Sequence, residues 1–108
     1  MNLIVIESPY QGNVKRNVAY ARAALRDSLL QGEYPLASHL LYTQEGVLND
    51  NLPAERERGI AAGHAWIQAA DFVAVYDDLG ISNGMKDGIE AARGLGVPIV
   101  YRTIGWPR

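Results

Sequence analysis

Residues 72–102 constrain the fold most, because a strand, a loop, a helix and a second strand follow one another there. An apolar run, Phe72–Tyr76, leads into a polar turn, and Ser82 is well placed to cap a helix. A second apolar run then ends at Arg102. Two strands joined by a helix run parallel in one sheet. Polar residues that follow such strands lie where ligands bind, at the carboxyl ends of the strands.

Two more strands and two more helices are predicted upstream. Residues 2–7 form a nearly continuous apolar run, which is typical of a strand buried on both faces, and residues 34–39 predict a weaker strand. Helical periodicity begins after Asn13 and again at Pro53, a residue that suits the first position of a helix. Residues 40–52 show no clear periodicity, and a loop of that length in a small domain is usually functional.

The predicted elements alternate as βαβαβαβ and fit one domain over residues 1–108. Because crossovers between parallel strands are right-handed, helices should cover both faces of a four-stranded parallel sheet. We therefore predict a Rossmann-like (flavodoxin-like) α/β fold with strand order 2-1-3-4 and three main helices. This order should bring residues 7–10 close to Asp77 and Asp78.

The composition excludes several classes of protein. The hydrophobic share of 48% and the charged share of 20% are ordinary for a globular protein. No apolar run reaches the roughly 18 residues of a membrane-spanning helix. The first residues do not resemble a secretory signal, so a cytoplasmic location and no membrane partner are expected. A net charge of −2 argues against a nucleic acid polymer as partner, whereas a small phosphorylated ligand stays compatible with it.

The residue types also limit the chemistry. The chain has no cysteine, which excludes disulfides and thiolate catalysis. Its two histidines, His39 and His64, lie far apart in the sequence and argue against a His-based metal site, so no metal is expected. The sequence has neither a Walker nor a dinucleotide glycine pattern, and no cofactor is expected.

Three carboxylates are expected at one end of the sheet. Glu7 closes a buried strand, where a charge is costly unless it has a partner or a role. Asp77 and Asp78 follow the third strand. Carboxylates at this place could accept hydrogen bonds from ribose hydroxyls or act at an anomeric carbon, and the two aspartates could equally form a turn.

Other candidates could hold the rest of a ligand. Ser82 could present the first N–H groups of a helix to an anion, or it could only cap that helix. Tyr10 and Tyr42 could stack on a base or be half-buried packing residues, and Arg102 could pair with an acid or meet a phosphate. The complete predicted ligand-binding set is Glu7, Ser8, Pro9, Tyr10, Ser38, His39, Tyr42, Asp77, Asp78, Ser82, Asn83, Gly84, Met85 and Arg102.

Three segments resemble the nucleoside 2-deoxyribosyltransferase-like superfamily: residues 4–10, 35–40 and 82–98. The resemblance is to small phage and bacterial branches, spans nearly the whole chain, and implies a nucleoside or nucleoside monophosphate as ligand. Active members of that superfamily cleave or exchange an N-glycosidic bond through a glutamate four residues after a helix glycine. The matching position, counted from Gly84, is Gly88, so the resemblance implies that the usual nucleophile is missing.

Glu7 and Asp87 are the carboxylates that could replace that nucleophile. Active members commonly have a small residue at the position of Glu7. Glu7 could therefore be a relocated nucleophile or base, or it could bind ribose in a pocket that holds its ligand without cutting it. Asp87 is one carbon shorter and lies about 100° round the helix from position 88, so it reaches the site only if the helix start is distorted.

The leading hypothesis is a protein that binds a nucleoside or nucleotide derivative and sequesters a nucleotide signal without cleaving it. The alternative is an N-glycosidic hydrolase or deoxyribosyltransferase that uses Glu7 or Asp87, and a third class is a structural subunit with a vestigial pocket. The resemblance also implies a homodimer or larger homo-oligomer, because members of the superfamily usually assemble in this way. Four residues are compatible with such contacts and equally with packing inside the domain: Gly59, Gly63, Trp66 and Trp106.

Overall fold

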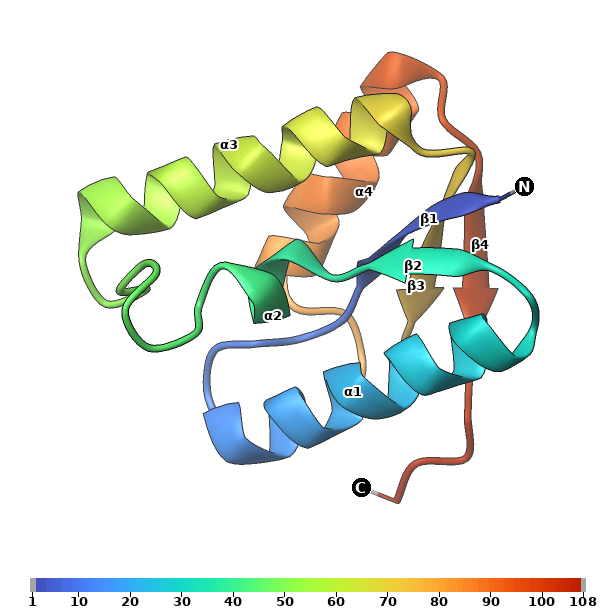
Figure 1. The fold of residues 1–108 in the computed structure, drawn as a ribbon, viewed down its shortest axis with the longest axis horizontal. Coiled ribbons are helices and arrows are strands. Elements are labelled where there is room, and N and C mark those ends of the chain that lie inside the picture. Colours follow the sequence, from blue (N-terminus) through green and yellow to red (C-terminus); the bar gives the residue numbers. More distant parts are fainter. Residues whose placement is uncertain (1, 108) are drawn as a thin grey trace.

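Four parallel strands form a single sheet in the computed structural model, which describes residues 2–107 (Figure 1). Their order is β2-β1-β3-β4, so the predicted order is confirmed. The strands are β1 (Leu3–Glu7), β2 (Tyr34–Leu36), β3 (Phe72–Tyr76) and β4 (Ile99–Arg102). In the register of the sheet, Glu7 lies opposite Val75 of β3, which places the Glu7 side chain at the carboxyl ends of the two central strands.

Four helices cover the sheet, and three of them are long. They are α1 (Val14–Leu30), α2 (Ser38–Leu41), α3 (Pro53–Ala69) and α4 (Asn83–Leu95). Figure 1 shows α1 on one face of the sheet and α3 and α4 on the other. The three long helices match the predicted ones, and α2 is an additional short helix. No helix within residues 2–107 is both long and apolar enough to cross a membrane.

The sheet has an apolar core on each face, because successive side chains of β1 and β3 point to opposite sides. Ile4 and Ile6 of β1 pack with Tyr20 of α1 in one core, whereas Val5 packs with Met85 of α4 in the other. The three β1 side chains are each at most 3% exposed. A strand buried on both faces is what the uninterrupted apolar run predicts.

Side-chain caps fix the two helix starts that follow β1 and β3. Asn13 Oδ1 accepts a hydrogen bond of 3.1 Å from the backbone N–H of Arg16, and Ser82 Oγ accepts one of 3.3 Å from the backbone N–H of Met85. Both predicted caps are therefore present, and each satisfies a backbone donor that the helix itself leaves free. Gly96, with a φ of 70°, then ends α4 in the left-handed conformation that favours glycine.

The strand predicted over residues 34–39 is too long, since β2 ends at Leu36 and Ser38 begins α2. β2 pairs with β1 only as far as Leu36, and the chain then turns to pack against α3. This packing is close: a Cβ atom added to Gly63 of α3 would lie 2.6 Å from Ser38 Oγ. Gly63 therefore serves packing inside the domain. Helix α2 also shortens the loop that was predicted over residues 40–52, because the helix ends at Leu41 and the loop begins only at Tyr42.

A buried polar cluster connects the two edge strands. Arg102, the last residue of β4, donates two hydrogen bonds of 2.7 Å to the carboxylate of Glu33, which precedes β2. Arg102 also donates to Tyr76 Oη at 3.1 Å, and its guanidinium lies 5.5 Å from the centre of the Phe72 ring. Ser28 Oγ of α1 donates to Glu33 at 2.7 Å. The hydrogen bonds from Arg102 are the main cause that lowers the pKa of Glu33.

A second polar cluster, around Asp78, fastens the C-terminal segment to α1. The Asp78 carboxylate accepts a hydrogen bond of 2.6 Å from Tyr20 Oη and bonds of 3.0 Å from the backbone N–H groups of Ile104 and Trp106. The Trp106 ring also packs edge-to-face on Tyr20, with the ring centres 5.6 Å apart. Burial opposes the charge of Asp78, but these donors outweigh it and lower the pKa of the carboxyl.

Candidate functional site

A cavity of about 370 Å³ lies at the carboxyl end of β1, with walls from α2, α3 and the start of α4. Its volume is within the range of small-molecule sites, roughly 300–1,000 Å³. The cavity brings together ten of the predicted ligand-binding residues: Glu7, Ser8, Tyr10, Ser38, His39, Tyr42, Ser82, Asn83, Gly84 and Met85. Whether these residues bind a ligand stays a prediction.

Five predicted site residues are absent from the walls of this cavity: Pro9, Asp77, Asp78, Asp87 and Arg102. Asp78 and Arg102 are engaged in the polar clusters described above. Asp77 forms the turn after β3, where its carbonyl accepts from the backbone N–H of Gly80. Asp87 is exposed on α4, and Pro9 is buried.

The sequence-based prediction missed the contribution of α3. Arg56, Ile60 and His64 of this helix line the cavity, and their spacing of four residues places them on one helical face. That periodicity is visible in the sequence, but nothing in it shows which face of α3 is turned toward the site. The predicted functional loop also contributes, through Asp50 among others.

Glu7 lines the cavity, and its carboxyl fills the space next to Gly88. A Cβ atom added to Gly88 would lie 2.5 Å from Glu7 Oε2 and 2.6 Å from Oε1, closer than real Cβ atoms approach other atoms. Residues 7 and 88 therefore compete for one volume. The Glu7 carboxyl lies where a side chain on the helix would begin.

The Glu7 carboxyl has no hydrogen-bond partner among residues 2–107. Burial is the main cause that raises its pKa, and the negative charge of Asp87 adds to this, so that the pKa of Glu7 rises to about 8. At neutral pH the group is therefore mostly a neutral carboxylic acid, which both donates and accepts a hydrogen bond. A polar group without a partner at the end of a cavity is poised to bond to a ligand.

Ser8 and His39 form a pair beside Glu7. A hydrogen bond of 2.6 Å joins Ser8 Oγ and His39 Nε2. Burial lowers the pKa of His39 to about 4, so the imidazole is neutral at physiological pH. The pair therefore offers a ligand neutral hydrogen-bonding groups and no charge.

Two tyrosines on the cavity wall, Tyr10 and Tyr42, each accept a hydrogen bond from a side chain that does not line the cavity. Tyr42 Oη accepts a hydrogen bond of 2.7 Å from Trp66 Nε1 of α3. The backbone carbonyl of Tyr10 accepts one of 2.8 Å from Asn17 Nδ2, a side chain that is 1% exposed. The bond to Tyr42 fixes its ring, whereas the bond to Tyr10 fixes its backbone, and both aromatic side chains offer flat apolar surface to a ligand.

The start of α4 forms the remaining wall, and two of its backbone N–H groups donate hydrogen bonds within the helix start itself. The N–H of Ser82 donates to Met85 Sδ, and the N–H of Met85 donates to Ser82 Oγ, both at 3.3 Å. Asn83 and Gly84, between them, are exposed. No group of three or more histidine, aspartate and glutamate side chains in the described part of the chain could hold a metal ion.

Replacing Gly88 with alanine obliges the end of the Glu7 side chain to move, and because that side chain is flexible the expected loss of stability is small, up to about 1 kcal/mol. The matched control is Gly94→Ala in the same helix, where an added Cβ meets nothing within 4 Å, and a gain of up to about 1 kcal/mol is expected. In a Glu7→Ala background, Gly88→Ala should behave like this control. Urea denaturation of the wild type, Gly88→Ala, Glu7→Ala and the double variant measures the coupling energy between residues 7 and 88. A coupling energy near zero would contradict the shared volume.

One of three comparisons with known proteins, that with solved structures, bears on the fold. A family profile described as "Domain of unknown function (DUF7768)" matches residues 2–102. A solved structure of a 2-deoxyribosyltransferase from Bacillus psychrosaccharolyticus superposes with a TM-score of 0.65 at 19% sequence identity. The match covers 98% of this chain and 76% of that one. A comparison with curated proteins gave no match. At this identity, the structural likeness shows a shared fold.

Proposed function

The chain belongs to the family described as "Domain of unknown function (DUF7768)", and because that description gives no activity, we propose a function from the cavity around Glu7. The cavity binds a nucleoside or nucleotide derivative and holds it without cleaving it. Support comes from the likeness in fold to a 2-deoxyribosyltransferase and from a cavity of about 370 Å³. Sequestration of a nucleotide signal is the biological role that we propose.

The observation that carries this proposal is the unpartnered carboxyl of Glu7. A covalent nucleophile must be ionised, and a carboxyl with a pKa of about 8 is ionised in about one molecule in ten at pH 7. A neutral carboxylic acid suits the binding of a sugar, because it can donate to one hydroxyl and accept from the next. Glu7 therefore favours holding a ligand over attacking it.

The other walls supply contacts for the rest of such a ligand. Tyr10 and Tyr42 would pack against the base, and the Ser8–His39 pair would bond to its polar edge or to the sugar. The small side chains at Ser82 and Gly84 leave the start of α4 accessible to the ligand. Asp77, Asp78 and Arg102 are left out of this site.

The second candidate function is an N-glycosidic hydrolase or deoxyribosyltransferase that uses Glu7. One observation favours it: the Glu7 carboxyl occupies the space beside Gly88, where the superfamily's nucleophile is expected. Asp87, the other candidate, is exposed and does not line the cavity.

Glu7→Gln and Glu7→Ala separate the two functions when the protein is incubated with a panel of nucleosides and nucleotides. For a binding protein we expect Gln, which mimics the neutral acid, to keep the affinity. Loss of the hydrogen bonds in Glu7→Ala should weaken it about 3–10-fold. For an enzyme, Glu7→Gln should lower turnover by about 10³-fold with binding kept.

Calorimetry measures the affinity, and chromatography of the released compounds measures cleavage. Free base in the wild-type reaction would exclude sequestration, whereas recovery of the intact ligand after heating would exclude the enzyme. If no compound of the panel binds or reacts, both functions fail and a structural subunit becomes the better explanation.

A homodimer or larger assembly also stays a proposal. Two large apolar side chains near the cavity are exposed, Leu41 at 42% and Trp66 at 43%. Trp106, by contrast, packs on Tyr20 and serves the fold. Light scattering from the purified protein measures the mass of the assembly.

A further inference from the structure

Two carboxylates carry the negative charge of the cavity wall, Asp50 and Glu55. Glu7 also lines the cavity, but with a pKa of about 8 it is mostly uncharged at neutral pH. Asp50 accepts a hydrogen bond from Gln11 Nε2 at 3.1 Å and also lies near the guanidinium of Arg56. Glu55 accepts one from the backbone N–H of Asn49 at 3.0 Å, and this neutral donor leaves the negative charge of Glu55 in place.

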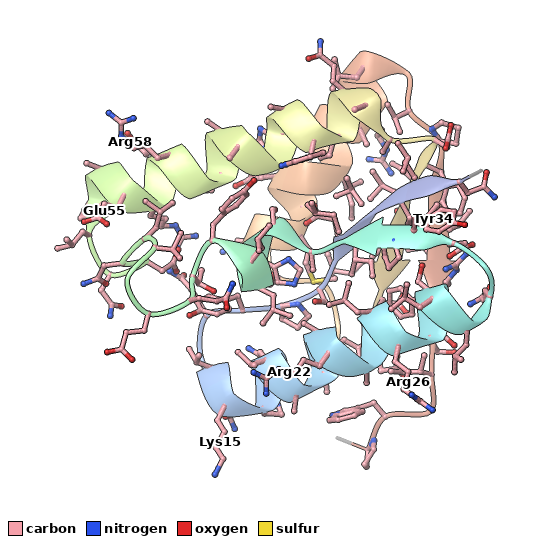
Figure 2. All side chains as sticks on the ribbon, in the orientation of Figure 1. Lys15, Arg22, Arg26, Tyr34, Glu55 and Arg58 are labelled. Atoms are coloured by element: carbon pink, nitrogen blue, oxygen red, sulfur yellow. The ribbon has the colours of Figure 1, made fainter. Side chains whose placement is uncertain are left out.

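Arg56 is the one lysine or arginine among the described residues of this wall, and its charge is partly used. Its Nη1 lies 3.9 Å from Asp50 Oδ2. Arg58 of the same helix points away from the body of the protein, as does Lys15 of α1 (Figure 2). His39 is neutral because burial lowers its pKa to about 4. A phosphate in this cavity would find one guanidinium, already near a carboxylate, and the imidazole of His64.

A more open hollow of about 860 Å³ continues outward from the cavity and is also acidic. The two share part of their walls, including Tyr10, Asp50 and Glu55. The hollow adds Glu45 and three carboxamide residues, Gln44, Asn49 and Asn51, and none of its described wall residues is a lysine, an arginine or a histidine. A ligand group that extends out of the cavity therefore meets carboxylate and amide groups.

The start of α4 is the one wall that favours an anion. A helix start acts as about half a positive charge, and its effect falls off within one turn. Two of its first N–H groups, those of Ser82 and Met85, are used in the cap. Half a charge does not offset the excess of carboxylates over the single arginine.

We infer that the cavity selects an unphosphorylated nucleoside over the corresponding nucleotide, because the carboxylates of Asp50, Glu55 and Glu45 outnumber the single arginine along the walls of the cavity and of the adjoining hollow. The inference rests on the proposed function and narrows it: the ligand that the protein sequesters is then an unphosphorylated nucleoside and not a nucleotide. A phosphate would bring up to two negative charges toward Asp50, Glu55 and Glu45, whereas hydroxyl groups would bond to the same side chains.

Calorimetric titration of the wild-type protein with matched pairs tests this inference, each pair being a nucleoside and its 5′-monophosphate in ribose and deoxyribose forms. Each nucleoside that binds should bind about tenfold more tightly than its monophosphate at low ionic strength. Because salt screens charges, the ratio should narrow when the ionic strength is raised to about 0.5 M.

Glu55→Gln and Asp50→Asn remove one negative charge each. Each variant should lower the ratio of nucleoside affinity to monophosphate affinity about threefold or more. The matched control is Glu57→Gln, which removes the same charge from an exposed position of α3 outside the cavity and should leave the ratio unchanged. A monophosphate that binds as tightly as its nucleoside, or more tightly, overturns the inference and leaves the proposed function standing. Absence of binding for both members of every pair overturns the inference and the proposed function together.

Discussion

Replacing Arg102 with methionine is expected to lower the free energy of unfolding by about 3–5 kcal/mol. The side chains of Arg102 and Glu33 are only 17% and 9% exposed, so removal of the arginine leaves a buried carboxylate without its counter-charge. Tyr76 Oη loses a donor in the same step. For a protein of 108 residues, each kcal/mol corresponds to a fall of about 4–8 °C in Tm. Guanidinium denaturation and thermal melting measure both quantities.

Two further variants make this prediction specific to the buried pair. Arg93→Met removes an arginine from an exposed pair with Glu90, in which the side chains are 61% and 71% exposed, and should cost less than about 1 kcal/mol. Glu33→Met combined with Arg102→Met should recover part of the loss, because no charge then stays buried alone. An Arg102→Met protein as stable as Arg93→Met would contradict a stabilising role for the cluster.

Glu7→Gln is expected to stabilise the protein increasingly as the pH rises from about 5 to about 8. In the folded state the pKa of Glu7 is about 8, whereas its ordinary value is 4.5, so between these values the folded protein keeps a proton that the unfolded chain releases. The stability of the wild-type protein therefore falls with rising pH, by about 1.4 kcal/mol per pH unit at most. Glutamine does not titrate. The difference between the two proteins should grow by up to about 4 kcal/mol across this window.

Urea denaturation at pH 5, 6, 7 and 8 measures this difference, and taking the variant relative to the wild type cancels other groups such as His39. The pKa of His39 is lowered from its ordinary value of 6.5 to about 4. The unfolded chain therefore takes up a proton on His39 before the folded protein does, and the free energy of unfolding falls as the pH decreases below 6.5. Asp87→Asn should lower the pKa of Glu7 and reduce the difference at pH 8, because it removes a neighbouring negative charge. A difference that does not change with pH would show that Glu7 ionises as an ordinary glutamate.

The strand order and the long helices were predictable because local signals in the sequence agree with the tertiary structure. The apolar run of β1 has residues for both cores, and Asn13 and Ser82 cap the helices that follow β1 and β3. In such segments the hydrophobic pattern and the capping residues point to the same element.

Residues 37–41 were mispredicted because a distant contact decides their conformation. Ser38 packs against Gly63 of α3, and a glycine in a helix does not indicate which segment will approach it. Asp78 was grouped with the ligand-binding carboxylates for a similar reason. Its partners include the hydroxyl of Tyr20 and the backbone N–H groups of Ile104 and Trp106, which lie in a segment without regular secondary structure. Backbone donors cannot be recognised from residue types in the sequence.

The position of the cavity was predictable from the sequence, whereas its side-chain arrangement was less so, and ligand binding there stays a prediction. Strand order alone brings Glu7 and the start of α4 to the carboxyl ends of the strands. That the Glu7 carboxyl reaches Gly88, and that no hydrogen-bond partner meets it there, depends on side-chain packing at the scale of an ångström. The sequence predicts that α4 lacks a nucleophile at Gly88 and that β1 carries a carboxylate at Glu7. Both predictions concern one place, because the Glu7 carboxyl lies next to Gly88.

The shared volume of residues 7 and 88 also limits the evolutionary routes that are open to this protein. A side chain at position 88 of α4 requires the Glu7 carboxyl to leave the place that it occupies, either by a change of rotamer or by mutation of Glu7 to a smaller residue. A lineage that moves the carboxyl between strand and helix can therefore pass through an ancestor with both acids and a rotated Glu7, or through one with a small residue at both positions. Only the second ancestor has no acid at this point, so an activity that depends on the acid is interrupted on that route alone, whereas simple retention of a ligand persists on both.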